Sequence, residues 1–92
     1  MSDGSTRRHV VISGEVQGVS FRDATREEAQ GAGVAGWVRN RDDGSVEAAF
    51  EGDADAVERL VEWCRSGPRS ADVDGVEASE EDPQGESGFE VR

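Results

Sequence analysis

The sequence predicts an α+β domain of the ferredoxin-like class, in which an antiparallel sheet carries two helices on one face. Short apolar or alternating segments, which are typical of strands, are separated by two segments with helical periodicity. Their order along the 92 residues is β-α-β-β-α-β, which is the split βαβ arrangement. A chain of this length forms one small domain, and no internal repeat indicates a second.

The chain begins with residues 1–6, which are small and polar and predict a flexible tail in front of a domain at 7–92. The first strand of that domain is expected at about 8–13, because this segment includes the apolar run Val10-Val11-Ile12.

The first helix is predicted at 21–32. Its apolar side is thin, with Phe21 and three alanines, so packing against the rest of the domain must hold it in place. Gly33 follows the last periodic residue, and a glycine at this position commonly ends a helix.

A hairpin is expected next, with strands at about 35–40 and 45–51. Asp43-Gly44 between them is typical of a tight hairpin turn. In the second of these strands, Val46, Ala48 and Phe50 share one face and predict the side that is buried.

A second helix is predicted to begin after Asp53, whose carboxylate can cap its first turn. Gly67-Pro68 stops this helix. Four apolar side chains lie on one narrow arc of it: Val57, Leu60, Val61 and Cys64.

The remainder is expected to hold a fourth strand within 71–78 and a short closing strand at 89–91. Between them, residues 79–87 are acidic and rich in turn formers, and they predict a loop.

The chain is strongly acidic, and its composition and net charge exclude several classes of function. Twenty-one acidic residues oppose ten basic ones, giving a net charge of −11, and every basic residue is arginine. The absence of lysine excludes a Walker phosphate loop and pyridoxal-phosphate chemistry, and the charge argues against nucleic-acid binding. This composition favours a halophile-like protein that works in a salt-loaded cytoplasm; an ordinary acidic protein is the alternative.

Other single features predict a soluble cytoplasmic monomer without a metal or cofactor. Cys64 is the only cysteine, and its place on the apolar arc indicates a buried structural thiol. No apolar run approaches the length of a membrane span. His9 is interpreted as a surface residue and Trp37 as a packing residue, and the acidic runs 42–43 and 80–82 as solvated loop rather than a metal site.

The segment 14–22, Gly-Glu-Val-Gln-Gly-Val-Ser-Phe-Arg, is the most informative part of the chain. It links a strand to a helix, and two glycines in it allow positive φ angles and close approach of the main chain to a ligand. Free N–H groups at the helix start favour an anion, and Arg22 adds a planar fork that matches phosphoryl oxygens. A structural turn remains the alternative, because such loops also occur for geometric reasons alone.

Two motifs resemble those of the acylphosphatase family. The first is I-S-G-E-V-Q-G-V-S-F-R at 12–22, and the second is G-W-V-R-N-R-D-D-G-S-V-E at 36–47. The resemblance extends more loosely over about 8–92. Family members often have threonine where this chain has Arg41 and Ser45.

The resemblance implies an enzyme that hydrolyses the carboxyl–phosphate anhydride of acyl phosphates to carboxylate and inorganic phosphate. It implies two catalytic residues, Arg22 for the phosphate and Asn40 for the attacking water. Arg22 is also implied in phosphate binding, together with the loop residues Val16, Gln17, Gly18, Val19 and Ser20. Two alternatives remain open: a non-catalytic anion-binding module, and a regulatory or RNA-binding ferredoxin-like domain.

Overall fold

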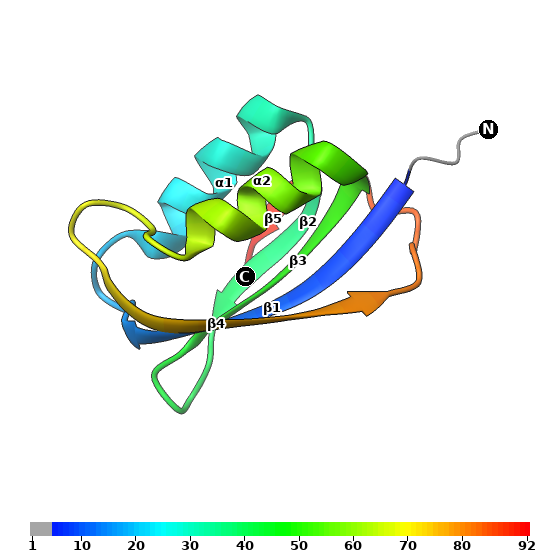
Figure 1. The fold of residues 1–92 in the computed structure, drawn as a ribbon. Helices are drawn as coiled ribbons and strands as arrows, with labels where there is room; N and C mark the ends of the chain where they lie inside the picture. The colour runs from blue at the N-terminus through cyan, green and yellow to red at the C-terminus, as the bar shows by residue number, and fades with distance from the viewer. Residues whose placement is uncertain (1–4) are drawn as a thin grey trace.

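The computed structural model describes residues 5–92 and shows two helices lying on one face of a five-stranded sheet (Figure 1). The sheet order is β4-β1-β3-β2-β5. This arrangement confirms the ferredoxin-like α+β class. The elements are β1 (Ser5–Glu15), α1 (Phe21–Ala32), β2 (Ala35–Asn40), β3 (Val46–Asp53), α2 (Ala54–Cys64), β4 (Asp72–Glu81) and β5 (Phe89–Val91).

The sheet is mixed, which corrects the prediction of a wholly antiparallel sheet. Strands β1, β2, β3 and β4 pair antiparallel, but β5 pairs with β2 in parallel, with Gly36 opposite Phe89 and Val38 opposite Val91. The chain reverses after β4, passes the start of β1 and the end of β3, and enters the far edge of the sheet in the direction of β2.

Three strands are longer than predicted, and two of them, β1 and β4, extend into the segments predicted as a tail and a loop. Strand β1 already begins at Ser5, so Ser5 and Thr6 belong to a strand rather than to the predicted tail, and residues 1–4 of that tail lie outside the described residues. Strand β4 runs to Glu81, into the segment predicted as a loop, because it pairs with β1 as far as Arg7. Both extensions are polar, so they carry no hydrophobic alternation from which they can be predicted.

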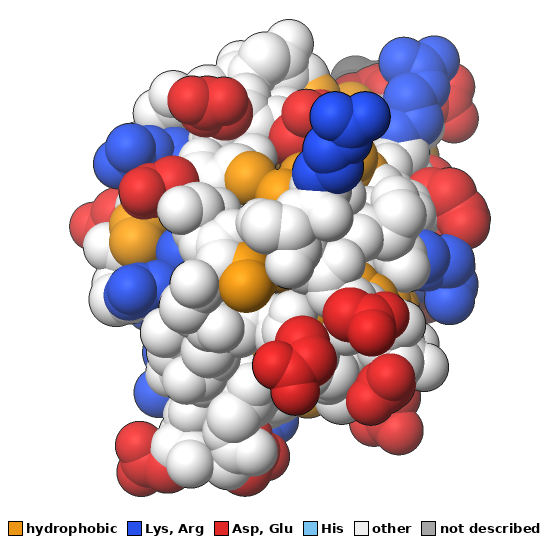
Figure 2. Space-filling model, turned by 90° about the vertical axis from the view of Figure 1, so that its left-hand side faces the viewer, with side chains coloured by type: hydrophobic (Ala, Val, Ile, Leu, Met, Phe, Trp, Pro, Cys, Tyr) orange, Lys and Arg blue, Asp and Glu red, His pale blue; other side chains and the backbone are white. Residues whose placement is uncertain are grey.

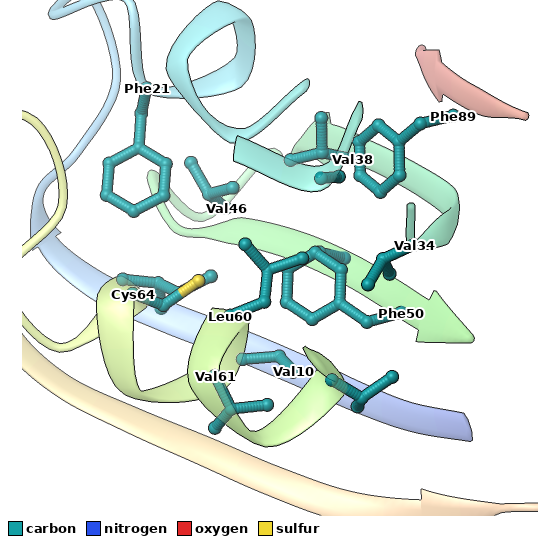
Figure 3. Close-up of a cluster of buried hydrophobic side chains, with 14 of the residues drawn as sticks. Val10, Phe21, Val34, Val38, Val46, Phe50, Leu60, Val61, Cys64 and Phe89 are labelled. Carbon is teal, nitrogen blue, oxygen red and sulfur yellow. The ribbon is translucent and has the colours of Figure 1, made fainter. Parts of the chain in front are cut away.

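The core fills the space between the helices and the sheet and fixes where α1 starts (Figure 3). Phe21, the first residue of α1, is 2% exposed, and its ring centroid lies 5.6 Å from that of Trp63 on α2. Cys64 is a buried free thiol as predicted, and burial raises its pKa to about 12. Because the Phe21 side chain is buried in the core, the position of the next residue, Arg22, in the first turn of α1 is fixed.

A buried pair of charged residues, Arg7 and Glu51, holds the connection from β4 to β5 in place. The Glu51 carboxylate accepts N–H bonds from Gln84, Gly85 and Glu86 at 2.8–3.2 Å, and it also lies 3.0 Å from Nη1 of Arg7. Burial acts to raise the pKa of Glu51, but these donors outweigh it and hold that pKa below its ordinary value. These contacts set the path by which β5 reaches β2.

The face of the sheet that bears no helix is polar. His9 lies there, half-buried, with Nε2 2.6 Å from a Glu47 carboxylate oxygen. Trp37 packs between the His9 ring, at a centroid distance of 6.5 Å, and the Arg92 guanidinium, at 4.9 Å. These contacts agree with a packing role for Trp37. They also show that the His9 side chain contacts Glu47 and Trp37 rather than solvent alone.

No helix within residues 5–92 is long and apolar enough to cross a membrane.

Candidate active site

The loop between β1 and α1 has a backbone that only certain residues adopt readily. Gly18 has φ 76°, and no heavy atom lies within 4 Å of where a Cβ would stand, so this glycine is needed for its backbone angle rather than for space. Ser20 also lies in the left-handed region, at φ 61°, which costs a non-glycine residue about 1–2 kcal/mol. This conformation opens the loop into a concave turn before the helix.

The N–H groups of this loop are available to a ligand. Ser20 stands at the cap position of α1, yet its side chain makes no capping bond. The first helical bond runs from the Ala24 N–H to the Ser20 carbonyl oxygen, so the three N–H groups before Ala24 have no partner in the helix. Within the described residues, the N–H groups of residues 17–20 likewise meet no acceptor. Such a set of free donors favours an anion.

Arg22 projects from the first turn of α1 beside this loop. It is half-buried, and its Nη1 donates to the main-chain oxygen of Arg92 at 3.2 Å. Arg92 in turn donates its N–H to the Val38 carbonyl oxygen on β2 at 2.8 Å. The end of β5 thus links Arg22 to the strand that carries Asn40.

Asn40 is the last residue of β2, and the strand places it on the same face as Val38, the face that the helices cover. It is half-buried, and its amide makes no hydrogen bond to any other described residue. A primary amide offers both donors and an acceptor, so this side chain is free to bind a water molecule.

A pocket of about 300 Å³ brings these groups together. Its lining includes five of the predicted site residues: Val16, Gly18, Ser20, Arg22 and Asn40. The side chains of two others, Gln17 and Val19, lie elsewhere: Gln17 reaches the hairpin turn, and Val19 packs against the core.

The same pocket includes three residues that the sequence analysis did not assign to a site. They are Phe21, Asp23 and Val91. Phe21 was expected only in the core, and Asp23 follows the motif. Val91 reaches the pocket because β5 pairs beside β2, and the sequence gives no signal of this contact.

The turn between β2 and β3 is held by its own side chains. The Asp43 carboxylate accepts from both the N–H and the hydroxyl of Ser45, at 3.0 and 2.5 Å. These two bonds hold the pKa of Asp43 below its ordinary value. Ser45 therefore stabilises the turn that follows Asn40 and makes no hydrogen bond with the Asn40 amide.

A larger hollow, of about 680 Å³, lies at the other end of β1 against the β4–β5 connection. Its lining includes the acidic residues Glu80, Glu81 and Asp82, and its arginine, Arg7, is already paired with Glu51, Glu81 and Glu86. It is therefore unsuited to an anion. No group of three or more His, Cys, Asp or Glu side chains within residues 5–92 is arranged to hold a metal ion.

Known proteins resemble this chain in both sequence and structure. The sequence profile of the family described as Acylphosphatase matches residues 8–91. An acylphosphatase from Rubrobacter xylanophilus is 60% identical over 87 residues, which cover 94% of this chain and 79% of that protein. One from Haloarcula marismortui is 59% identical over 87 residues, which cover 95% of this chain and 96% of that protein.

The solved structure of an acylphosphatase from Coxiella burnetii matches this fold with a TM-score of 0.95. It is 38% identical in sequence, and the match covers 100% of both chains. The agreement extends over every element described above.

Proposed function

Because this chain belongs to the acylphosphatase family and is a hydrolase of carboxyl–phosphate anhydrides, we propose that its pocket divides the reaction between two groups. Arg22 and the loop N–H groups hold the phosphoryl group, and Asn40 orients the attacking water. The observation that carries this proposal is the single pocket lined by Arg22, Asn40 and the loop.

The chemistry of the substrate explains why so few residues suffice. The leaving group is a carboxylate, whose conjugate acid has a pKa of about 4, so it departs without a proton donor. Catalysis then requires a bound phosphoryl group, positive potential at its oxygens and a water molecule in line with the breaking bond.

The first two requirements fall to the loop and the arginine. The N–H groups of residues 17–20 and of the first turn of α1 have no acceptor within the described residues, and Gly18, Ser20 and Phe21 from this segment line the pocket. The Arg22 guanidinium contributes a full charge and two parallel donors. Both sets of donors contact the phosphoryl oxygens of the bound substrate and of the transition state. They stabilise the transition state more, because more negative charge develops on these oxygens there.

The third requirement falls to Asn40. Its amide accepts a hydrogen bond from the water and fixes the direction of a lone pair towards phosphorus. As the water oxygen bonds to phosphorus, the anhydride P–O bond breaks and the acyl group leaves as carboxylate. The proton released by the water passes to a phosphoryl oxygen, so no basic side chain takes part. The enzyme needs no metal in this mechanism, because Arg22 and the N–H groups supply the positive potential.

Turnover is expected to be independent of added metal. We expect phosphate release from benzoyl phosphate, a simple aryl acyl phosphate, to continue unchanged in excess chelator. Inorganic phosphate should inhibit competitively, because it occupies the same loop. The measurement is the initial rate of phosphate release with and without chelator. Strong inhibition that magnesium reverses would contradict the metal-free mechanism.

The acidic surface supports the further proposal that the protein works as a cytoplasmic monomer at high salt. Acidic side chains are spread over the face shown in Figure 2, with arginines among them. At molar salt the screening length falls to about 3 Å, so the carboxylates repel one another far less than in dilute buffer.

The thermal midpoint of unfolding is therefore expected to fall as potassium chloride is lowered from molar to millimolar. The reason is a net charge of −11 on a small domain. The midpoint is measured by circular dichroism. A variant with exposed carboxylates of β4 neutralised, Asp72→Asn, Asp74→Asn and Glu80→Gln, should depend less on salt. A midpoint that is the same at every salt concentration would contradict the proposal.

A further inference from the structure

Gln17 lies in the loop between β1 and α1, but its side chain reaches the hairpin turn between β2 and β3. Its Nε2 donates to the main-chain oxygen of Arg41 at 2.7 Å and to that of Ser45 at 2.9 Å. Both partners are carbonyl oxygens, which only accept, so the amide nitrogen must face them and uses both of its protons.

The two carbonyls belong to the pair of residues that closes the hairpin turn. The Arg41 N–H donates to the Ser45 carbonyl oxygen at 2.8 Å, and the Gly44 N–H donates to that of Arg41 at 3.2 Å. Arg41 directly follows Asn40. The Gln17 amide therefore holds the backbone next to Asn40, at the point where β2 ends.

These two hydrogen bonds connect the β1–α1 loop directly to the turn between β2 and β3. Within residues 5–92, no other hydrogen bond joins residues 16–20 to residues 41–45. The loop is also held from another side, where the Ser70 hydroxyl donates to the Val19 carbonyl oxygen at 2.9 Å. That contact joins the loop to the segment before β4 and involves neither Asn40 nor the hairpin turn.

We propose that Gln17 is a positioning residue that sets the distance between the bound phosphoryl group and the water held by Asn40. The inference rests on the roles proposed above for Arg22 and Asn40. The role belongs to the Gln17 side chain alone, and the Gln17 main-chain N–H keeps its proposed place among the phosphate-binding donors of the loop. An in-line attack requires the water and the phosphorus to be aligned, and displacement by about 1 Å can cost as much as a hundredfold in rate.

The test is a double-mutant cycle in kcat between Gln17→Met and Asn40→Ala. Methionine keeps the length of the side chain and removes both donors. We expect Gln17→Met alone to lower kcat on the order of tenfold while the competitive inhibition constant of inorganic phosphate stays unchanged. In the Asn40→Ala background, the same substitution should change kcat by less than about twofold, because no oriented water remains to be misplaced. Gln30→Met, on the exposed side of α1, is the matched control and should leave kcat unchanged.

A second variant gives a pH readout. In Gln17→Glu, the ionised carboxylate faces two carbonyl oxygens and repels them, whereas the protonated form can donate one hydrogen bond. The kcat of Gln17→Glu relative to the wild type should therefore rise as the pH falls towards about 5. The same ratio for Gln17→Met should stay flat with pH.

Three results would overturn the inference. They are an unchanged kcat in Gln17→Met, a loss of equal size in both backgrounds, and a weakened phosphate inhibition constant, which would return Gln17 to phosphate binding. The proposed function fails separately, if Asn40→Ala alone leaves kcat unchanged. All rates are measured at a temperature where circular dichroism shows each variant folded.

Discussion

Replacing Arg22 with alanine is expected to lower kcat/KM by about a thousandfold, with both the binding of substrate and the chemical step impaired. In the proposed mechanism the guanidinium contacts the phosphoryl oxygens in the bound substrate and more strongly in the transition state, so its loss should affect KM and kcat together. Steady-state kinetics on benzoyl phosphate in high salt measures both constants.

Two further variants make this result specific. Arg22→Lys should recover little activity, because an ammonium group cannot form the two parallel bonds of the guanidinium fork. Arg59→Ala removes an exposed arginine from α2 and should leave kcat/KM unchanged. Near-normal activity in Arg22→Ala would show that the loop N–H groups hold the phosphoryl group without it.

Replacing Asn40 with alanine is expected to lower kcat by about a hundredfold or more while KM changes little. In the proposed mechanism the Asn40 amide contacts the water rather than the phosphoryl group, so its loss should remove an interaction that matters only as the water attacks. Asp42→Ala, in the exposed turn two residues on, is the control and should keep the wild-type kcat. A kcat close to the wild-type value in Asn40→Ala would remove the water-orienting role.

The parts of the fold that could be predicted from the sequence are those with a strong local signal. Helix α1 and strand β2 have the predicted bounds, 21–32 and 35–40, since Gly33 ends the helix and the Asp43-Gly44 turn limits the strand. The Asp53 cap of α2 was also predictable, and its carboxylate accepts from the N–H of Asp55 at 3.1 Å.

The parallel pairing of β5 could not be predicted in this way. Its direction depends on the path of residues 82–88, which Glu51 holds through main-chain N–H groups and Arg7 holds through Glu86. A lone glutamate in a strand pattern gives no sign that it is buried, because glutamate is mostly exposed in proteins. The contact is long-range, and local propensity carries no information about it.

The candidate site shows the same division between local and long-range signals. The place of Gly18 and Arg22 beside one pocket was predictable, because a glycine loop that leads into a helix start with an arginine is a local pattern of residue types at fixed spacing. The destination of the Gln17 side chain was not, since a glutamine beside a phosphate loop has equal capacity to bind the ligand or a carbonyl oxygen. Val91 lines the pocket only because β5 lies beside β2.

The proposal that Arg22 binds the phosphoryl group and Asn40 orients the water is tested most directly by the equilibrium affinity for inorganic phosphate. This affinity is measured by calorimetry on both alanine variants. We expect the Kd to rise about tenfold or more in Arg22→Ala, because charge-assisted hydrogen bonds to the phosphate are lost. In Asn40→Ala the Kd should stay within about twofold of the wild-type value, since the proposed mechanism assigns the amide to the water alone. Equal weakening in both variants, or wild-type affinity in Arg22→Ala, would contradict the mechanism.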